Sequence, residues 1–154
     1  MQIKSQNTPL DVKKLLQLRN TLFDAIKKCD EIISLVSNET LRKTLLGLEQ
    51  LNYQYVRELN AQIESLGGKP LEVIFNDNKQ LDFLISLSKK AKGEIEKKAV
   101  GICTQIEKSA IELYNKMLKS SIGNDNLRKM IQYQRNGIMC ASQQLKLLTQ
   151  FIHR

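Results

Sequence analysis

Apolar residues recur every three or four positions through four long stretches of the chain, with polar residues between them. This spacing places the apolar side chains on one face of an α-helix. The pattern predicts helices over residues 10–36, 39–66 and 92–119, and a last helix from Asn124 or Asp125 to Ile152. The expected core stripes are Leu15, Leu18, Leu22, Ile26, Cys29, Ile33 and Val36; Leu41, Leu45, Leu48, Asn52, Val56, Leu59, Ile63 and Leu66; Ile95, Ala99, Ile102, Ile106, Ala110, Leu113 and Met117; and Leu127, Ile131, Gln134, Ile138, Ala141, Leu145, Leu148 and Ile152.

The segments between these stretches carry residues that end and begin helices. Ser37 and Asn38 follow the first helix and offer side-chain oxygens to cap the second. Gly67-Gly68 and Pro70 stop the second helix. Because the first two helices are separated by only a few residues, they are expected to form an antiparallel hairpin, and residues 120–123 join the last two helices in the same way.

Residues 71–90 show no continuous stripe and contain the turn signal Asn76-Asp77-Asn78. We interpret them as a long connection with one or two helical turns, which crosses the bundle so that the second and third helices run parallel. Residues 1–9 are expected to be a flexible leader, and residues 10–154 a single domain. The predicted fold is an all-α, ferritin-like four-helix bundle, in which two antiparallel helical hairpins are joined by a long crossover connection.

A faint internal repeat supports two matched hairpins. The second helix opens with Asn38-Glu-Thr-Leu-Arg-Lys and the fourth with Asn124-Asp-Asn-Leu-Arg-Lys. The offset is 127 − 41 = 86 residues, measured between Leu41 and Leu127. Capping chemistry recurs in unrelated helices, so the matching architecture is the stronger part of this evidence.

Short motifs in the second and third helices resemble those of uncharacterised bacterial ferritin-like domains related to rubrerythrin. The second helix ends in Leu66-Gly67-Gly68-Lys69-Pro70, and Glu107 is followed seven residues later by Tyr114. The resemblance extends over most of the chain, from Leu10 to Ile152. It implies a ferritin-like fold and hints at a role in stress physiology.

The ligand set of a ferritin-like di-iron enzyme is incomplete in this chain. Such a site takes a Glu from each of two helices and a Glu-x-x-His pair from each of the other two. The one histidine, His153, lies one residue from the end of the sequence. Glu49 is followed by Asn52 in place of histidine, and by the 86-residue offset the fourth helix carries Arg135 and Ile138. The remaining positions are Asn20, Thr21 or Asp24 on the first helix and Glu107 on the third. We therefore expect no metal, no other cofactor and no enzymatic activity.

Glu49, Asn52 and Glu107 remain only weak candidates for metal ligands, and Gln134 is a further polar residue on the core stripes. Glu49 and Glu107 are the best acidic candidates, and both are expected to flank the stripes and face solvent or a salt bridge. Asn52 and Gln134 fall on the core stripes and are expected to be satisfied buried amides that fix helix register. The alternative is the remnant of a polar pocket.

The three cysteines lie far apart in sequence and form no Cys-x-x-Cys motif. Counting residues along the helices places Cys29 and Cys103 in one core layer, with Cys140 nearby but turned toward the boundary. We favour small apolar side chains that fill this layer. The sharper hypothesis is a thiol pair that binds a soft metal or responds to oxidants.

The remaining observations narrow the class of function. No apolar run reaches the roughly 18 residues of a membrane helix, and the N-terminus lacks a signal-peptide core, so we expect a cytoplasmic protein. The net charge is +8, but the basic run Lys89–Lys98 contains Glu94 and Glu96 and lacks aromatic residues, which disfavours nucleic acid. The favoured function is a non-catalytic helical module that acts by association; the alternatives are a ferritin-like metal or redox protein with a degenerate site, and a basic bundle associated with nucleic acid. We expect a homodimer, with Tyr53, Tyr55 and Tyr133 as interface aromatics.

Overall fold

The computed structural model describes residues 9–69, 92–120 and 122–152. Within these ranges the chain forms four helices and no strand: α1 (Pro9–Ile33), α2 (Glu39–Ser65), α4 (Lys92–Lys119) and α5 (Asp125–Ile152). The four predicted helices are thereby confirmed. The expectations for the leader and for the connection over residues 71–90 lie outside the described residues, except that Pro9 already belongs to α1.

The first helix differs from its prediction at both ends. It begins at Pro9, where a proline is tolerated because the first helical N–H has no partner within the helix. It ends at Ile33, three residues before the predicted end. The amides of Leu35 and Val36 both donate to the Ile32 carbonyl, at 2.9 and 3.2 Å, so the chain turns there. Val36 remains buried, which explains why it fitted the apolar stripe.

The two hairpins begin their second helices in the same way. Asn38 accepts a hydrogen bond from the Leu41 amide (2.9 Å), and Asn124 accepts one from the Leu127 amide (3.2 Å). The backbone carbonyls of the same two residues accept from the amides of Arg42 and Arg128. The internal repeat is thus a repeat of N-caps, each of which satisfies a free helical N–H.

Two glycine residues form the C-terminal end of α2. Gly67 has a φ of 87°, a left-handed conformation that is costly for other residues. The Gly68 amide then donates to the Ile63 carbonyl at 2.9 Å and closes the end of the helix. The sequence prediction of a stop at this point is confirmed.

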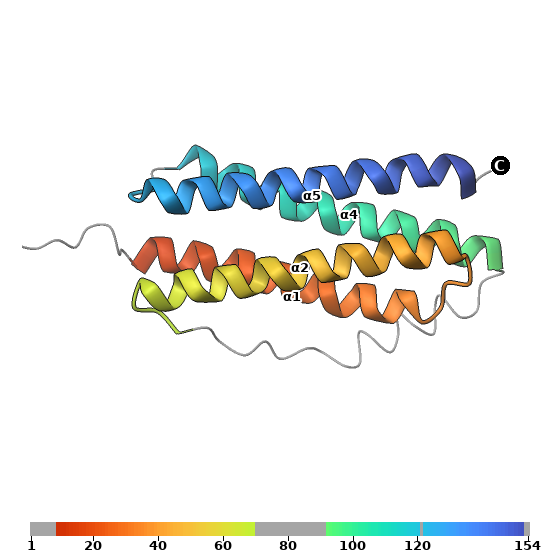
Figure 1. Ribbon diagram of the computed structural model, residues 1–154, viewed down its shortest axis with the longest axis horizontal. Coiled ribbons are helices and arrows are strands. Elements are labelled where there is room, and N and C mark those ends of the chain that lie inside the picture. Colours follow the sequence, from red (N-terminus) through yellow and green to blue (C-terminus); the bar gives the residue numbers. More distant parts are fainter. Residues whose placement is uncertain (1–8, 70–91, 121, 153–154) are drawn as a thin grey trace, which may run out of the picture.

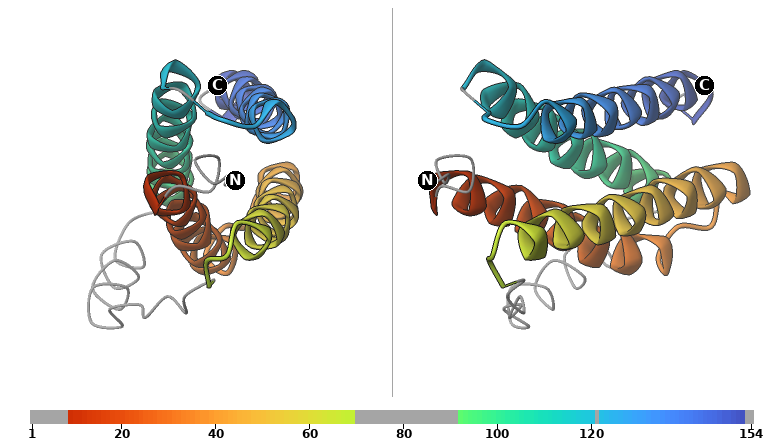
Figure 2. Two further views of the ribbon diagram at one scale, coloured as in Figure 1. Left: turned by 90° about the vertical axis from the view of Figure 1, so that its left-hand side faces the viewer. Right: turned by 60° about the vertical axis from the view of Figure 1, so that its left-hand side comes forward.

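The helices form two antiparallel hairpins, α1–α2 and α4–α5 (Figure 1). α2 and α4 start at the same end of the bundle and run parallel, as predicted. Each hairpin packs against the other twice, because α1 contacts α4 and α2 contacts α5. Seen end-on, each helix therefore has two antiparallel neighbours around a shared core (Figure 2). No helix of the described ranges is long and apolar enough to cross a membrane.

Where their side chains are described, the predicted stripes of α1, α2 and α5 face the core, but the stripe of α4 is rotated. Ile102, Ile106 and Leu113 are only partly buried. The core-facing positions of α4 are instead Ala99, Val100, Cys103, Glu107, Ala110, Tyr114, Met117 and Leu118. A carboxyl group thus occupies the centre of the buried face of α4.

Candidate functional site: a polar layer beneath the α2–α5 groove

The apolar core is divided into two clusters. One runs from Leu15 to Ile26 on α1, and the other begins on the same helix at Cys29. At the division the other three helices place polar side chains in the interior. These are Asn52 and Glu49 on α2, Glu107 on α4 and Ser142 on α5, all of them buried. We call this set the polar layer.

Glu107 is the most isolated member of the polar layer. Only 3% of the residue is exposed, and neither carboxylate oxygen has a hydrogen bond of ordinary geometry. Burial raises the pKa of Glu107 to about 7, although the nearby Ser142 hydroxyl and the Lys146 ammonium act in the opposite direction. The expectation that Glu107 faces solvent or a salt bridge is wrong, because the rotation of α4 turns it into the core.

Glu49 is also buried rather than solvent-facing, so the same expectation is wrong for it. Burial raises the pKa of the Glu49 carboxyl, and the charge of Asp30 on α1 and a hydrogen bond to that residue raise it further. The Glu49 carboxyl therefore holds its proton more readily than an exposed glutamate does.

The two core amides differ in how well they are satisfied. Gln134 accepts a hydrogen bond from the Tyr114 hydroxyl (2.8 Å) and donates one to Glu58 of α2 (2.8 Å), so the predicted satisfied amide is confirmed. Tyr114 is fully buried, and burial raises the pKa of its phenol well above the ordinary value. The Oδ1 atom of Asn52 has no hydrogen-bond partner, so for this residue the prediction is wrong in part.

The thiols lie as predicted by counting along the helices. Cys29 of α1 and Cys103 of α4 are fully buried in one cluster, and Cys140 is exposed. A hydrogen bond with the Cys29 thiol is the main cause that raises the pKa of Cys103, and burial raises it further. A protonated, enclosed thiol is a poor nucleophile and a poor metal ligand. These features favour the packing role over the redox or soft-metal role.

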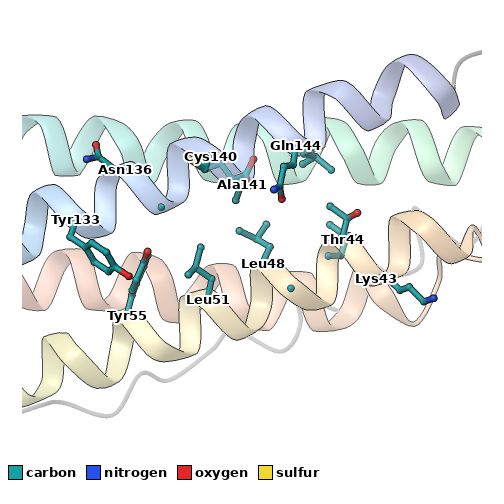
Figure 3. Close-up of a pocket in the computed structure, with 15 residues that line it drawn as sticks. Lys43, Thr44, Leu48, Leu51, Tyr55, Tyr133, Asn136, Cys140, Ala141 and Gln144 are labelled. Atoms are coloured by element: carbon teal, nitrogen blue, oxygen red, sulfur yellow. The ribbon is translucent and has the colours of Figure 1, made fainter.

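A groove between α2 and α5 opens above the polar layer and has a volume of about 550 Å³. Leu48, Leu51 and Tyr55 line it from α2, opposite Tyr133, Cys140 and Ala141 on α5 (Figure 3). Glu107 reaches it from α4. Tyr55 packs edge-on against Tyr133, with ring centroids 6.4 Å apart, and closes the groove at one end. The arrangement is a mostly apolar recess with one carboxyl group among its lining residues.

The positions of a di-iron site are occupied by unsuitable groups. Arg135 donates to Asn115 of α4 at 3.1 Å, and Ile138 is buried in the apolar core. In the part of the chain that the structure describes, no three His, Cys, Asp or Glu side chains converge as metal ligands do. His153 lies outside that part.

Comparison with known proteins shows the fold and no more. No protein-family model matches the sequence, and no curated protein is similar to it at a significant level. One solved structure is similar. It is the crystal structure of a DUF305 fragment from Deinococcus radiodurans, with a TM-score of 0.67 and 17% sequence identity over 90% of this chain and 97% of the fragment. The likeness to the DUF305 fragment shows that the two chains share a helical fold.

Sequence reasoning missed Ser142 and misplaced Glu107. The spacing of Cys103, Glu107, Ala110 and Tyr114, in steps of four, three and four, is as regular as the stripe chosen for α4. The signal was therefore present, but it required a carboxylate to be accepted at a core position, which is rare for an unpaired group. The groove itself had no signal in the sequence.

Gly137→Ala is expected to lower the free energy of unfolding by about 1–2 kcal/mol. A β-carbon at this position would overlap the hydroxyl of Tyr55, whose ring is buried. The matched control is Gly47→Ala on α2, where a β-carbon meets no atom within 4 Å. The control should gain about 0.5–1 kcal/mol from helix propensity. Urea unfolding measures both, and a Tyr55→Phe background should relieve the loss. Equal gains in both alanine variants would contradict the packing described here.

Proposed function

We propose that this chain is a non-catalytic helical module of the ferritin-like kind that acts by associating with a second copy of itself. The parallel course of α2 and α4 and the repeated N-caps support the ferritin-like topology. The surface that supports self-association is the groove side of α5.

The groove side of α5 has the spacing of a helix-packing seam. Tyr133, Gly137, Cys140, Gln144 and Leu147 follow one another in steps of four, three, four and three residues. The first four of these residues line the groove, and the two end residues are largely exposed, Tyr133 by 63% and Leu147 by 58%. Large exposed apolar side chains at seam spacing are the single observation that carries the proposal. We call these five residues the α5 seam.

The charges around the α5 seam favour a second copy as the occupant. Two copies with a net charge of +8 each repel one another, and a contact surface without charged side chains adds least to that repulsion. Residues 136–145 contain no charged side chain. Of the flanking cations, Arg135 donates to Asn115 of α4, and the charge of Lys146 acts on Glu107. The α5 seam can therefore approach its own copy without a like-charge contact.

The α5 seam is also self-complementary under a twofold axis. Tyr133 and Leu147 each lie seven residues from Cys140, since 140 − 133 = 7 and 147 − 140 = 7. An antiparallel pairing of two α5 helices places Cys140 near the axis and Tyr133 over Leu147 of the partner subunit. Gln144 of the partner subunit then lies near Asn136, at the rim of the groove. Such an isologous contact produces a closed dimer, to which no third copy can be added through the same surface.

The expected result in solution is a dimer of about 35 kDa, twice the 17.7 kDa chain. Sedimentation equilibrium measures its dissociation constant. Tyr133→Glu should weaken it at least about tenfold, because it places a charge in an apolar contact. Tyr53→Glu is the matched control, since Tyr53 is 46% exposed on α2 and does not line the groove.

Cross-linking tests the geometry independently of the mass. A short bis-maleimide should join the two copies through Cys140, and Cys140→Ser should abolish this product. A monomer at high concentration contradicts the proposal. A dimer that Tyr53→Glu breaks and Tyr133→Glu leaves intact assigns the contact to another face.

A further inference from the structure

The lining of the groove includes a group whose bonding capacity is unused. Both oxygens of Glu107 are buried without a hydrogen bond of ordinary geometry, and the residue lines the cavity. A buried carboxylate without donors costs several kcal/mol, so proteins seldom keep one unless something binds to it. The Ser142 hydroxyl and the Lys146 ammonium already act on this carboxyl, and any further partner of its two acceptor oxygens must be a donor.

The surroundings of Glu107 restrict the kind of donor. Leu48, Leu51, Ala141 and Leu145 form an apolar part of the lining, against which an apolar body fits. The lining also includes the polar side chains of Lys43, Thr44, Asn136 and Gln144. A divalent metal ion needs several converging ligands, and within residues 9–69, 92–120 and 122–152 no group of three acidic, thiol or imidazole side chains supplies them. An organic cation needs only one carboxylate and an apolar wall.

We propose that the α2–α5 cavity binds an amphiphilic organic ammonium ion, whose cationic head pairs with Glu107 and whose apolar body lies among Leu48, Leu51 and Leu145. A protonated primary amine has three donors, and two of them match the two oxygens of one carboxylate. The ion pair is formed away from water, which strengthens it relative to a surface pair. The leucine side chains supply the hydrophobic part of the affinity.

This inference does not depend on the α5 seam. Four residues of the α5 seam line the groove from α5, whereas Glu107 reaches it from α4. Dimerisation is measured by mass and ligand binding by heat, so either proposal can fail alone. The Leu147→Glu variant, if monomeric, should still bind the ligand, because Leu147 belongs to the α5 seam but does not line the groove.

The test is isothermal titration calorimetry of the full chain with three probes that share one tail: octylammonium, octanol and octanoate. Titrations are made at pH 8, where most of the Glu107 carboxyl is ionised. Octylammonium should bind with one site per chain and at least about tenfold more tightly than octanol, since a hydrogen-bonded charge pair contributes about that factor. Octanoate should bind most weakly.

Glu107→Gln keeps the shape of the side chain and removes its charge, so it should abolish the preference for octylammonium over octanol. Glu112→Gln, an exposed glutamate on the same helix, is the matched control and should leave the preference unchanged. Equal binding of octanol and octylammonium, or no binding of either, overturns the proposal. Stoichiometric binding of Mn²⁺ or Zn²⁺ that Glu107→Gln removes would overturn it as well, because the site would then be a metal site.

Discussion

Glu107→Gln is expected to raise the free energy of unfolding by about 3 kcal/mol at pH 8 and to leave it almost unchanged at pH 4.5. In the folded protein the pKa of Glu107 is raised from 4.5 to about 7 by burial. A carboxyl group with a raised pKa is more easily protonated in the folded chain than in the unfolded one. The stability that accompanies protonation is fully present below pH 4.5 and is lost as the pH rises to about 7.

Glutamine resembles the protonated carboxyl in shape and carries no charge, so the variant avoids this loss. Urea unfolding at pH 4.5, 6 and 8 gives the difference between wild type and variant at each pH. Glu112→Gln serves as the control, because an exposed carboxyl loses little solvation on folding. If the wild type and Glu107→Gln differ by the same amount at all three pH values, the Glu107 carboxyl is not desolvated in the folded protein.

Gln134→Met is expected to cost about 2–4 kcal/mol of unfolding free energy. Methionine fills a similar volume but offers no amide. The Tyr114 hydroxyl, which is fully buried, then loses its acceptor, and Glu58 loses its donor from α5. A buried donor without a partner costs more than the hydrogen bond contributed, because its hydration is not restored.

The control for this variant is Gln143→Met, an exposed glutamine on the same helix, which should change stability little. Adding Tyr114→Phe to Gln134→Met should recover part of the loss, since the orphaned hydroxyl is then removed together with its acceptor. A loss below about 0.5 kcal/mol in Gln134→Met would show that water replaces the amide.

Most of the fold could be predicted from interactions between residues that are close in sequence. Asn38 and Gly67 act on the backbone within a few residues of themselves, so the helix start and the helix end that they produce can be predicted from the sequence. Leu15 and Leu22 belong to a stripe with charged residues outside it, which leaves one orientation for α1. The all-helical architecture and both hairpins followed from signals of this kind.

The candidate site was harder to predict, because it depends on how two hairpins meet. Apolar residues occupy a wide arc of α4, and Ile102 and Cys103 are equally plausible core positions by sequence. Contacts with α1 and α5 select Cys103, and with it they bury Glu107. The separation of α2 and α5 depends on Tyr55 filling the space that Gly137 leaves, a match between residues 82 positions apart (137 − 55 = 82).

The 86-residue offset between the two N-caps extends to whole helices, since 125 − 39 = 86 separates the first residues of α2 and α5. The same shift carries α1 onto α4. This is the pattern that a tandem duplication of one helical hairpin leaves, and the pairs α1–α4 and α2–α5 then correspond to contacts of a helix with its own copy. A half-length ancestor would have built the same bundle as a dimer of hairpins. In that history Glu49 and Arg135 descend from one residue, and at least one of the two positions changed after the duplication.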